Sequence, residues 1–124
     1  MMKTKILNVG IMSREAFRNR TIGIARGEYV PKKDEPKVWF ESIKSMAQVL
    51  SAENQTLLKL IVEKKPQSIT ELEALSGRKK SNLSRTLKTL ERYGIVSLKK
   101  EDRKIVPVVE ATEFRVEFDL NSAA

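Results

Sequence analysis

Residues 68–93 constrain the fold of the chain most, because their pattern predicts two short helices joined by a tight turn. Ser68 and Glu71 have the spacing of a capping box, in which side chains bond the free N–H groups at a helix start. Gly77 stands where a helix often ends in a left-handed residue. Three apolar residues at helical spacing are expected to face the core from this first helix: Ile69, Leu72 and Leu75.

The second helix, expected over residues 80–93, combines one apolar stripe with a long basic face. The stripe consists of Leu83, Leu87 and Leu90. The residues off the stripe are polar or basic, namely Lys80, Ser81, Asn82, Ser84, Arg85, Lys88, Thr89 and Arg92. Such a helix is held by its leucines and offers hydrogen-bonding cations to a negatively charged partner. The pattern as a whole is typical of a helix-turn-helix.

The positive charge of the chain is concentrated in the same region. The formal net charge is +8, and residues 78–104 carry 10 basic and 3 acidic side chains, a net of +7. Residues 110–124 are acidic instead, with 1 basic and 4 acidic side chains, a net of −3. Charge alone is weak evidence, because solvated basic surfaces are common. Its coincidence with the helix-turn-helix pattern indicates a phosphate backbone as the partner.

The residue types that are missing exclude several classes of site. The chain has no cysteine, which excludes disulfides and thiolate metal sites, and no histidine, the commonest general base and metal ligand. It shows no carboxylate cluster and no glycine-rich phosphate loop, so we expect no cofactor, no metal and no enzymatic activity. It also lacks a run of about 18 apolar residues and a leader pattern, so we expect no membrane span and a cytoplasmic location.

The first 50 residues predict one strand and two helices. Residues 5–11 alternate as in a short strand, and Ser13 is expected to cap a helix running to about Arg26. The expected inner face of that helix is Ala16, Phe17, Thr21, Ile24 and Ala25. Trp39 is expected to anchor the core, the alternative being an exposed recognition aromatic. The inner face expected for a helix over residues 41–50 is Ile43, Met46, Ala47 and Leu50.

The segments on either side of residues 68–93 are also patterned. Ser51 begins a helix that Pro66 must end, and its expected inner face is Leu57, Leu58, Ile61 and Val62. After Gly94 the apolar period changes from about 3.6 residues to 2, which predicts a basic β-hairpin over residues 96–109. The hairpin should turn at residues 101–103, and Pro107 should lie on an edge or break its strand. Residues 114–120 alternate most strictly, which predicts a half-buried strand that needs a partner, within one chain or across two.

Residues 57–109 resemble the MarR-type winged helix-turn-helix regulators. The sequence blocks that carry the resemblance are Ile69-Thr70-Glu71-Leu72, Ser76-Gly77, Asn82-Leu83-Ser84-Arg85-Thr86-Leu87 and Leu90-Glu91-Arg92-Tyr93-Gly94-Ile95-Val96. The last block is similar to the family's L-E-x-x-G-L-V, which ends the recognition helix and enters the wing. The whole chain also resembles small prokaryotic winged-helix DNA-binding proteins, predicted to be transcriptional regulators, in its Phe40-Glu41-Ser42 entry and its closing Arg115-Val116-Glu117.

The resemblance implies an α+β fold with a three-helix core and a β-hairpin wing. The extra elements would be an N-terminal strand and helix and a C-terminal strand. The chain departs from the family pattern at two points. Lys79-Lys80 stands where a Ser or Thr usually precedes the recognition helix, and Glu101-Asp102-Arg103 replaces the common Asp-Gly at the wing tip.

The helix pattern and the resemblance together assign candidate DNA contacts. A recognition helix at about residues 80–93 would enter the major groove, and a wing at residues 96–109 would meet the backbone or the minor groove. The base-reading candidates are Ser81, Asn82, Ser84, Arg85 and Lys88. The backbone or wing candidates are Lys79, Lys80, Thr89, Arg92, Lys99, Lys100, Arg103 and Lys104. For each lysine the alternative is an ordinary solvated side chain.

The expected organisation has three parts. Residues 1–50 form an N-terminal extension and lead helix for dimerisation, residues 51–109 the winged-helix DNA-binding domain, and residues 110–124 a C-terminal strand. Because specific sites usually need two reading heads related by a dyad, we expect a homodimer on double-stranded DNA. The rival hypothesis is a protein-interaction module of the antitoxin type, which binds a toxin-like or other protein partner through its acidic tail. RNA is disfavoured, since the basic region holds Tyr93 as its one aromatic residue.

Overall fold

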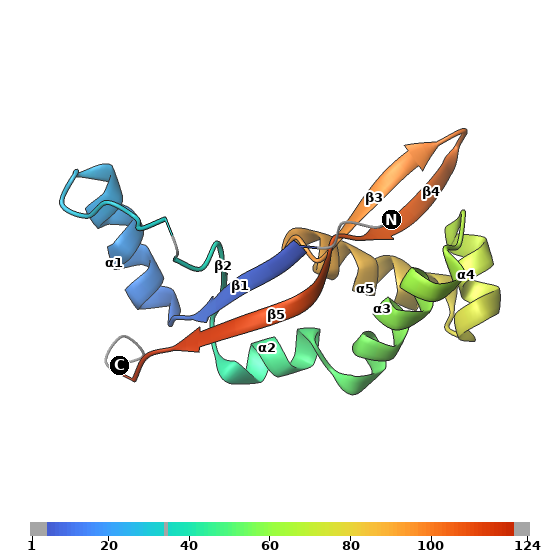
Figure 1. Ribbon diagram of the computed structural model, residues 1–124, viewed down its shortest axis with the longest axis horizontal. Helices are drawn as coiled ribbons and strands as arrows, with labels where there is room; N and C mark the ends of the chain where they lie inside the picture. The colour runs from blue at the N-terminus through green and yellow to red at the C-terminus, as the bar shows by residue number, and fades with distance from the viewer. Residues whose placement is uncertain (1–4, 34, 121–124) are drawn as a thin grey trace. The chain divides into compact units, whose positions relative to one another are not determined.

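The protein has a mixed α+β structure, in a computed structural model that describes residues 5–33 and 35–120 (Figure 1). Within these residues it contains five helices and two sheets, so the α+β class expected from the sequence is confirmed. The helices are α1 (Arg14–Ala25), α2 (Ile43–Val49), α3 (Ala52–Lys64), α4 (Ile69–Ser76) and α5 (Lys80–Arg92). The strands are β1 (Lys5–Ile11), β2 (Val38–Phe40), β3 (Val96–Glu101), β4 (Lys104–Val109) and β5 (Ala111–Phe118).

The described residues form two compact units. Unit 1 consists of Lys5 and Val49–Glu113, and it contains α3, α4, α5 and the β3–β4 hairpin. Unit 2 consists of Ile6–Gln48 and residues 114–120, and it contains α1, β2 and most of α2, β1 and β5. All of the DNA-contact candidates from the sequence lie in unit 1.

In unit 1, the helices α3, α4 and α5 pack around a core that the β3–β4 hairpin completes. The predicted stripe of α5 is confirmed, since Leu83, Leu87 and Leu90 are each 0% exposed. The inner face predicted for α3 is largely confirmed, with Val62 half-buried and the following residues buried: Leu57, Leu58 and Ile61. The hairpin and its flanking residues contribute more buried residues to this core: Ile95, Val96, Val106, Val109 and Ala111.

Leu75 of α4 is 41% exposed, and its predicted place in the core is wrong. Ile69 and Leu72 are buried as predicted. A spacing of three residues falls short of a full turn of about 3.6 residues, so each step moves the side chain about 60° around the helix. After two steps Leu75 has left the buried face, and Ser76, seven residues after Ile69, takes the inner position and is half-buried.

The predicted helix ends of unit 1 and α1 are confirmed. The Oγ atoms of Ser13, Ser51 and Ser68 accept hydrogen bonds of 3.1, 3.2 and 3.0 Å from backbone N–H groups three residues later. These bonds satisfy donors that the first turn of a helix leaves unpaired. Pro66 follows α3 directly after its cap, and Gly77 ends α4 with a φ of 73°, a left-handed conformation that glycine adopts without strain.

The β3–β4 hairpin turns through Asp102 and Arg103, as the polar residues predicted. Both have positive φ, 46° and 68°, as in the two-residue turns that match the twist of a hairpin, although Arg103 occupies a place that glycine favours. Counted outward from the turn, the pair of Leu98 and Pro107 falls where N–H groups point away from the partner strand. Pro107 therefore removes no ladder hydrogen bond, and β4 is an edge strand of a two-stranded sheet.

Unit 2 is built on a three-stranded sheet in the order β2–β1–β5. β1 and β2 are parallel, with Gly10 in register with Trp39. The ring of Trp39 lies directly against Gly10, where the Cβ atom of any other residue would overlap it. Glycine is therefore required at this position by the close approach of an aromatic ring.

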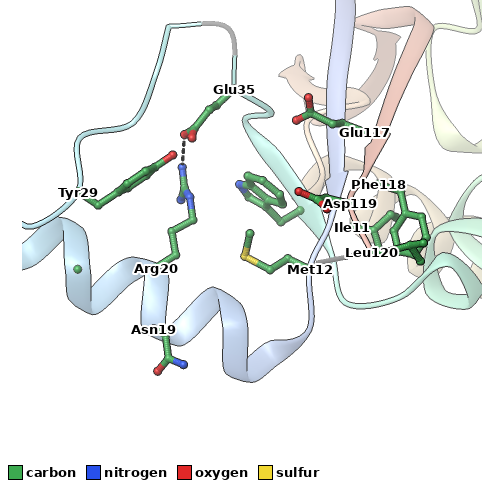
Figure 2. Close-up of a pocket in the computed structure, with 12 residues that line it drawn as sticks. Ile11, Met12, Asn19, Arg20, Tyr29, Glu35, Glu117, Phe118, Asp119 and Leu120 are labelled. Atoms are coloured by element: carbon green, nitrogen blue, oxygen red, sulfur yellow. Dashed lines mark hydrogen bonds and ion pairs between the residues drawn. The ribbon is translucent and has the colours of Figure 1, made fainter. Parts of the chain in front are cut away.

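Arg20 of α1 is the centre of the polar contacts of unit 2 (Figure 2). Its Nη2 atom pairs with Glu35 Oε2 at 2.8 Å. Its guanidinium carbon lies 5.1 Å from the ring centroid of Trp39 and 5.7 Å from that of Tyr29. A guanidinium at this distance is attracted by the negative face of an aromatic ring. Charged and aromatic side chains therefore hold this part of unit 2 in place of an apolar helix face.

The apolar faces predicted for α1 and α2 are not buried. Neither helix contains a buried residue. The residues that are exposed against expectation are Phe17, Thr21, Ala25, Ile43 and Ala47. α2 also begins at Ile43 instead of Glu41, because Ser42 Oγ accepts a hydrogen bond from the N–H of Ser45 at 3.0 Å. Periodicity detects a helix with an apolar side, but it does not reveal whether another element covers that side.

Trp39 is not the core anchor that its size predicted. Phe40, its neighbour in β2, is fully buried, whereas Trp39 is half-buried against Gly10 and Arg20. Successive residues of a strand point to opposite faces of the sheet. The two aromatic rings therefore lie on opposite faces of the sheet, and the smaller ring, that of Phe40, is the one that is fully buried.

β5 confirms one expectation and corrects another. It lies beside β1 in the same chain, so the terminal strands are neighbours as predicted. Its apolar face was expected to be half-buried, but Val116 is 49% exposed and Phe118 43%, and Leu120, just past the strand, is 79% exposed. Phe114 is half-buried. Strand pairing satisfies the backbone, whereas burial of a sheet face requires another layer over it.

We expect Leu83→Ala to lower the free energy of unfolding by about 2–5 kcal/mol, because a fully buried leucine leaves a cavity when it is truncated. The matched control Leu75→Ala should lower it by less than about 1 kcal/mol, because that side chain already contacts water. Urea unfolding followed by circular dichroism measures both values. Equal losses for the two variants would contradict the difference in burial.

Candidate nucleic-acid interface

α5 presents a row of exposed polar and basic side chains on the side opposite its buried leucines. Successive residues of a helix are about 100° apart, so positions 81, 85, 88 and 92 point away from the leucine stripe. Ser81, Arg85, Lys88 and Arg92 are all exposed, and we call these four residues the α5 ridge. The ridge carries three of the positive charges that the sequence assigned to DNA contacts.

The other candidates on α5 occupy different positions. Asn82 is exposed beside the ridge, and Lys79 and Lys80 are exposed at the helix start. Ser84 and Thr89 are half-buried. The hydroxyl of Thr89 donates to the carbonyl oxygen of Arg85 at 3.1 Å. This bond uses the only proton of the hydroxyl, so Thr89 can offer a ligand only its oxygen lone pairs.

A carboxylate from α4 caps the start of α5. Lys79 holds the N-cap position and makes no side-chain hydrogen bond there, as the missing Ser or Thr implies. Glu73 Oε2 instead accepts a hydrogen bond from the backbone N–H of Lys80 at 3.1 Å. A negative charge at a helix N-terminus also interacts favourably with the helix dipole. Glu73 thus helps to position the candidate interface, and the sequence pattern missed it because its partner lies in another helix.

Arg78 ties the turn before α5 to the start of α3. Its Nη2 donates to the carbonyl oxygen of Glu53 at 2.6 Å, and its Nη1 donates to Oδ1 of Asn54 at 3.3 Å. An open depression of about 650 Å³ lies here, with Asn82 and Arg85 among its lining residues. No local spacing could have identified this role, because the partners of Arg78 are 24 and 25 residues away along the chain.

The β3–β4 hairpin carries the remaining candidates. Lys99, Lys100, Arg103 and Lys104 are all exposed. Lys99 and Lys100 point to opposite faces of β3, because side chains alternate along a strand. The four cations therefore surround the tip of the hairpin and do not form a single face. Figure 1 shows this tip extended beyond the helices of unit 1.

The cations of the α5 ridge and the hairpin are not neutralised by the described acidic side chains. In residues 5–33 and 35–120, ion pairs join Arg14 to Glu41 and Arg20 to Glu35, both within unit 2. The ridge and hairpin cations take part in neither pair. Their positive potential therefore remains available to an anionic partner.

Two other kinds of site have no support in the described part of the chain. No group of three or more acidic side chains there is placed to hold a metal ion. None of the helices described is both long and apolar enough to cross a membrane.

We expect Glu73→Ala to lower the free energy of unfolding by about 0.5–2 kcal/mol, the usual cost of losing a helix cap. A suitable control is Glu63→Ala in α3, an exposed glutamate without a side-chain hydrogen bond in the described structure. Urea unfolding gives both values, and amide hydrogen exchange should show faster exchange in the first turn of α5 for Glu73→Ala alone. A Glu73→Ala protein as stable as the control would rule out this capping role.

Comparison with known proteins identifies a family. No curated protein and no solved structure matches the chain. The model of the HVO_A0114 family matches residues 49–116, a range that nearly coincides with unit 1. Because this range covers more than half of the sequence, the chain belongs to the HVO_A0114 family.

Proposed function

We propose that unit 1 is a winged helix-turn-helix and that the protein is a sequence-specific, double-stranded DNA-binding transcriptional regulator. The observation that carries the proposal is the α5 ridge. Its three cations are exposed, stand outside the ion pairs of the described residues, and are backed by leucines that are 0% exposed. A rigid helix with such a face matches the charge and the groove geometry of duplex DNA.

The order of elements in unit 1 supports the winged-helix assignment. Three helices, α3 to α5, are followed by the antiparallel β3–β4 hairpin, which is the order implied by the resemblance to MarR-type regulators. The helices α4 and α5 are separated by residues 77–79, within the range of a helix-turn-helix turn. α5 has 13 residues and is about 20 Å long. A major groove about 12 Å wide admits an α-helix.

Base reading is assigned to the N-terminal half of α5. Arg85 is the first candidate, because a guanidinium can bond both O6 and N7 of guanine. Asn82, exposed beside it, can bond adenine in the same bidentate way. Ser81 and Lys88 extend the ridge on either side of Arg85 and can add single hydrogen bonds to bases.

Backbone contact is assigned to the cations around the helix start and the hairpin. Lys79 and Lys80 precede the ridge, and Arg92 ends it. Lys100 and Arg103 lie near the hairpin tip, where they could follow a phosphate strand or enter the minor groove. Contacts of this kind position a protein on DNA without distinguishing sequences, so their loss should weaken binding on every duplex equally.

We expect Arg85→Ala to weaken binding to the preferred duplex by about 1–3 kcal/mol and to relax specificity at one base position. Fluorescence anisotropy on the chain's own upstream DNA and on a scrambled duplex, each at two salt concentrations, measures the effect. Arg14→Ala, which truncates an exposed arginine of unit 2, is the matched control. Equal losses on both duplexes would show that Arg85 touches only phosphate. If the unaltered protein bound neither duplex, the regulator function would be wrong and a protein-interaction module would replace it.

We expect Lys100→Ala to weaken binding on any sequence and to reduce the slope of log affinity against log salt by about one, because one fewer counterion is released. The control is Lys59→Ala, which removes an exposed lysine from α3. Anisotropy titrations over a series of salt concentrations give both slopes. An unchanged slope for Lys100→Ala would remove the hairpin from the DNA interface.

A further inference from the structure

The apolar side of β5 is a row of exposed residues in a sheet whose other two strands each contain a fully buried apolar residue. Val9 of β1 and Phe40 of β2 are 0% exposed, whereas Val116 and Phe118 of β5 are 49% and 43% exposed. Figure 2 shows Glu117 and Phe118 on opposite sides of β5, so the strand has a distinct polar and apolar face. Single exposed apolar residues are ordinary, but a contiguous row marks an interaction surface.

β5 is also the edge of its sheet. In the order β2–β1–β5, β1 pairs with one edge of β5, and no strand of the described residues pairs with the other. The N–H and C=O groups on such an edge form a template for a further strand. β5 contains neither proline nor glycine, the residues that commonly block this kind of pairing. Its side chains from Arg115 onward are all exposed.

The sequence of β5 is suited to pairing with itself. Residues 114–118 read Phe-Arg-Val-Glu-Phe, which is symmetric about Val116 except that the charge changes sign. Antiparallel pairing about a two-fold axis at Val116 places Phe114 opposite the partner's Phe118. The same pairing places Arg115 opposite the partner's Glu117. Apolar residues then meet on one face of the sheet and opposite charges on the other, and both kinds of cross-strand pair are favourable.

We propose that two copies of this chain form a dimer by antiparallel pairing of β5 with the same strand of the second copy, centred on Val116. The two three-stranded sheets become one continuous sheet, and the two exposed apolar rows become neighbours on one face. A two-fold interface must be complementary to itself, and the charge-inverted symmetry of residues 114–118 meets this requirement.

Neighbouring registers are less favourable. A two-fold axis perpendicular to the sheet keeps each side chain on its own face, so the axis must pass through one residue and its copy. An axis at Arg115 would place two arginines opposite each other, and an axis at Glu117 would place two glutamates opposite each other. Like charges directly opposite are destabilising. Asp119 lies beyond the end of β5 at Phe118, so it does not enter the paired stretch.

The dimer goes beyond the proposed DNA binding and does not rest on it. If both hold, one particle carries two copies of α5, as a dyad-symmetric operator requires. The experiments below contain no DNA, so their failure is distinguishable from a failure to bind DNA.

The first experiment exchanges the two charges of the strand. Arg115→Glu and Glu117→Arg each place like charges opposite each other at two symmetry-related positions, whereas the double variant restores opposite charges in reversed order. We expect each single variant to raise the dimer dissociation constant about 10-fold or more, and the double variant to return it to within about threefold of the original. Sedimentation equilibrium measures the constants, and circular dichroism checks that each variant is folded.

The second experiment is a disulfide test, for which the chain is well suited because it has no cysteine. Val116→Cys places the two thiols directly opposite each other on the axis, within the reach of a disulfide. The control is Phe118→Cys on the same face of the same strand. Its copy lies opposite residue 114, about 13 Å away along the strand, which is too far to bridge. Mild oxidation should give a covalent dimer of Val116→Cys and not of Phe118→Cys, on a non-reducing gel.

Three results would overturn the proposal. The first is a chain that remains monomeric at micromolar concentration, including one that then forms a complex with a different protein. The second is a dimer whose dissociation constant the single charge variants leave unchanged. The third is cross-linking of Phe118→Cys as efficient as that of Val116→Cys. Weakening by both single variants, recovery in the double variant and selective cross-linking at residue 116 would support it.

Discussion

The burial of three leucines on one side of α5 is the constraint on which the rest of unit 1 depends. Leu83, Leu87 and Leu90 are each 0% exposed, so the rotation of α5 about its own axis is determined by the core. Any other rotation would bring Arg85 or Lys88 toward apolar surroundings, where an unpaired charge is costly. The outward direction of the α5 ridge is therefore a consequence of hydrophobic packing, and no contact of the ridge itself is needed to maintain it.

Polar contacts also position α5, because they tie its N-terminal end to the neighbouring helices. Glu73 joins the start of α5 to α4, and Arg78 joins the preceding turn to α3. All three bonds involve a charged group, and hydrogen bonds of this kind are stronger than those between neutral groups. A surface built on helices that are tied together in this way is preorganised, which suits the rigid duplex DNA that we propose as its partner.

The two units differ in how they use apolar residues. The helices of unit 1 bury apolar residues, whereas α1 and α2 of unit 2 bury none. Unit 2 also contains the Arg20–Glu35 pair with its aromatic neighbours, and it leaves Val116 and Phe118 exposed. The proposed DNA surface is thus basic and lies in unit 1, and the proposed dimer strand is apolar and lies in unit 2. The two surfaces carry different residues, so the effects of variants on DNA binding and on association can be measured in separate assays.

The sequence alone determined what depends on near neighbours in the chain: the serine caps, the helix that ends before Pro66, the leucine stripe of α5, the hairpin and the exposure of most candidate contacts. Only the tertiary structure decided which apolar faces are covered. Apolar patterns also occur at Leu75, on the faces of α1 and α2, and on β5, but these residues are exposed or only half-buried. It also decided that Phe40 and not Trp39 is fully buried, and it supplied the cap from Glu73. Periodicity is set by the geometry of one helix or strand, whereas burial and long-range hydrogen bonds depend on which other elements pack against it.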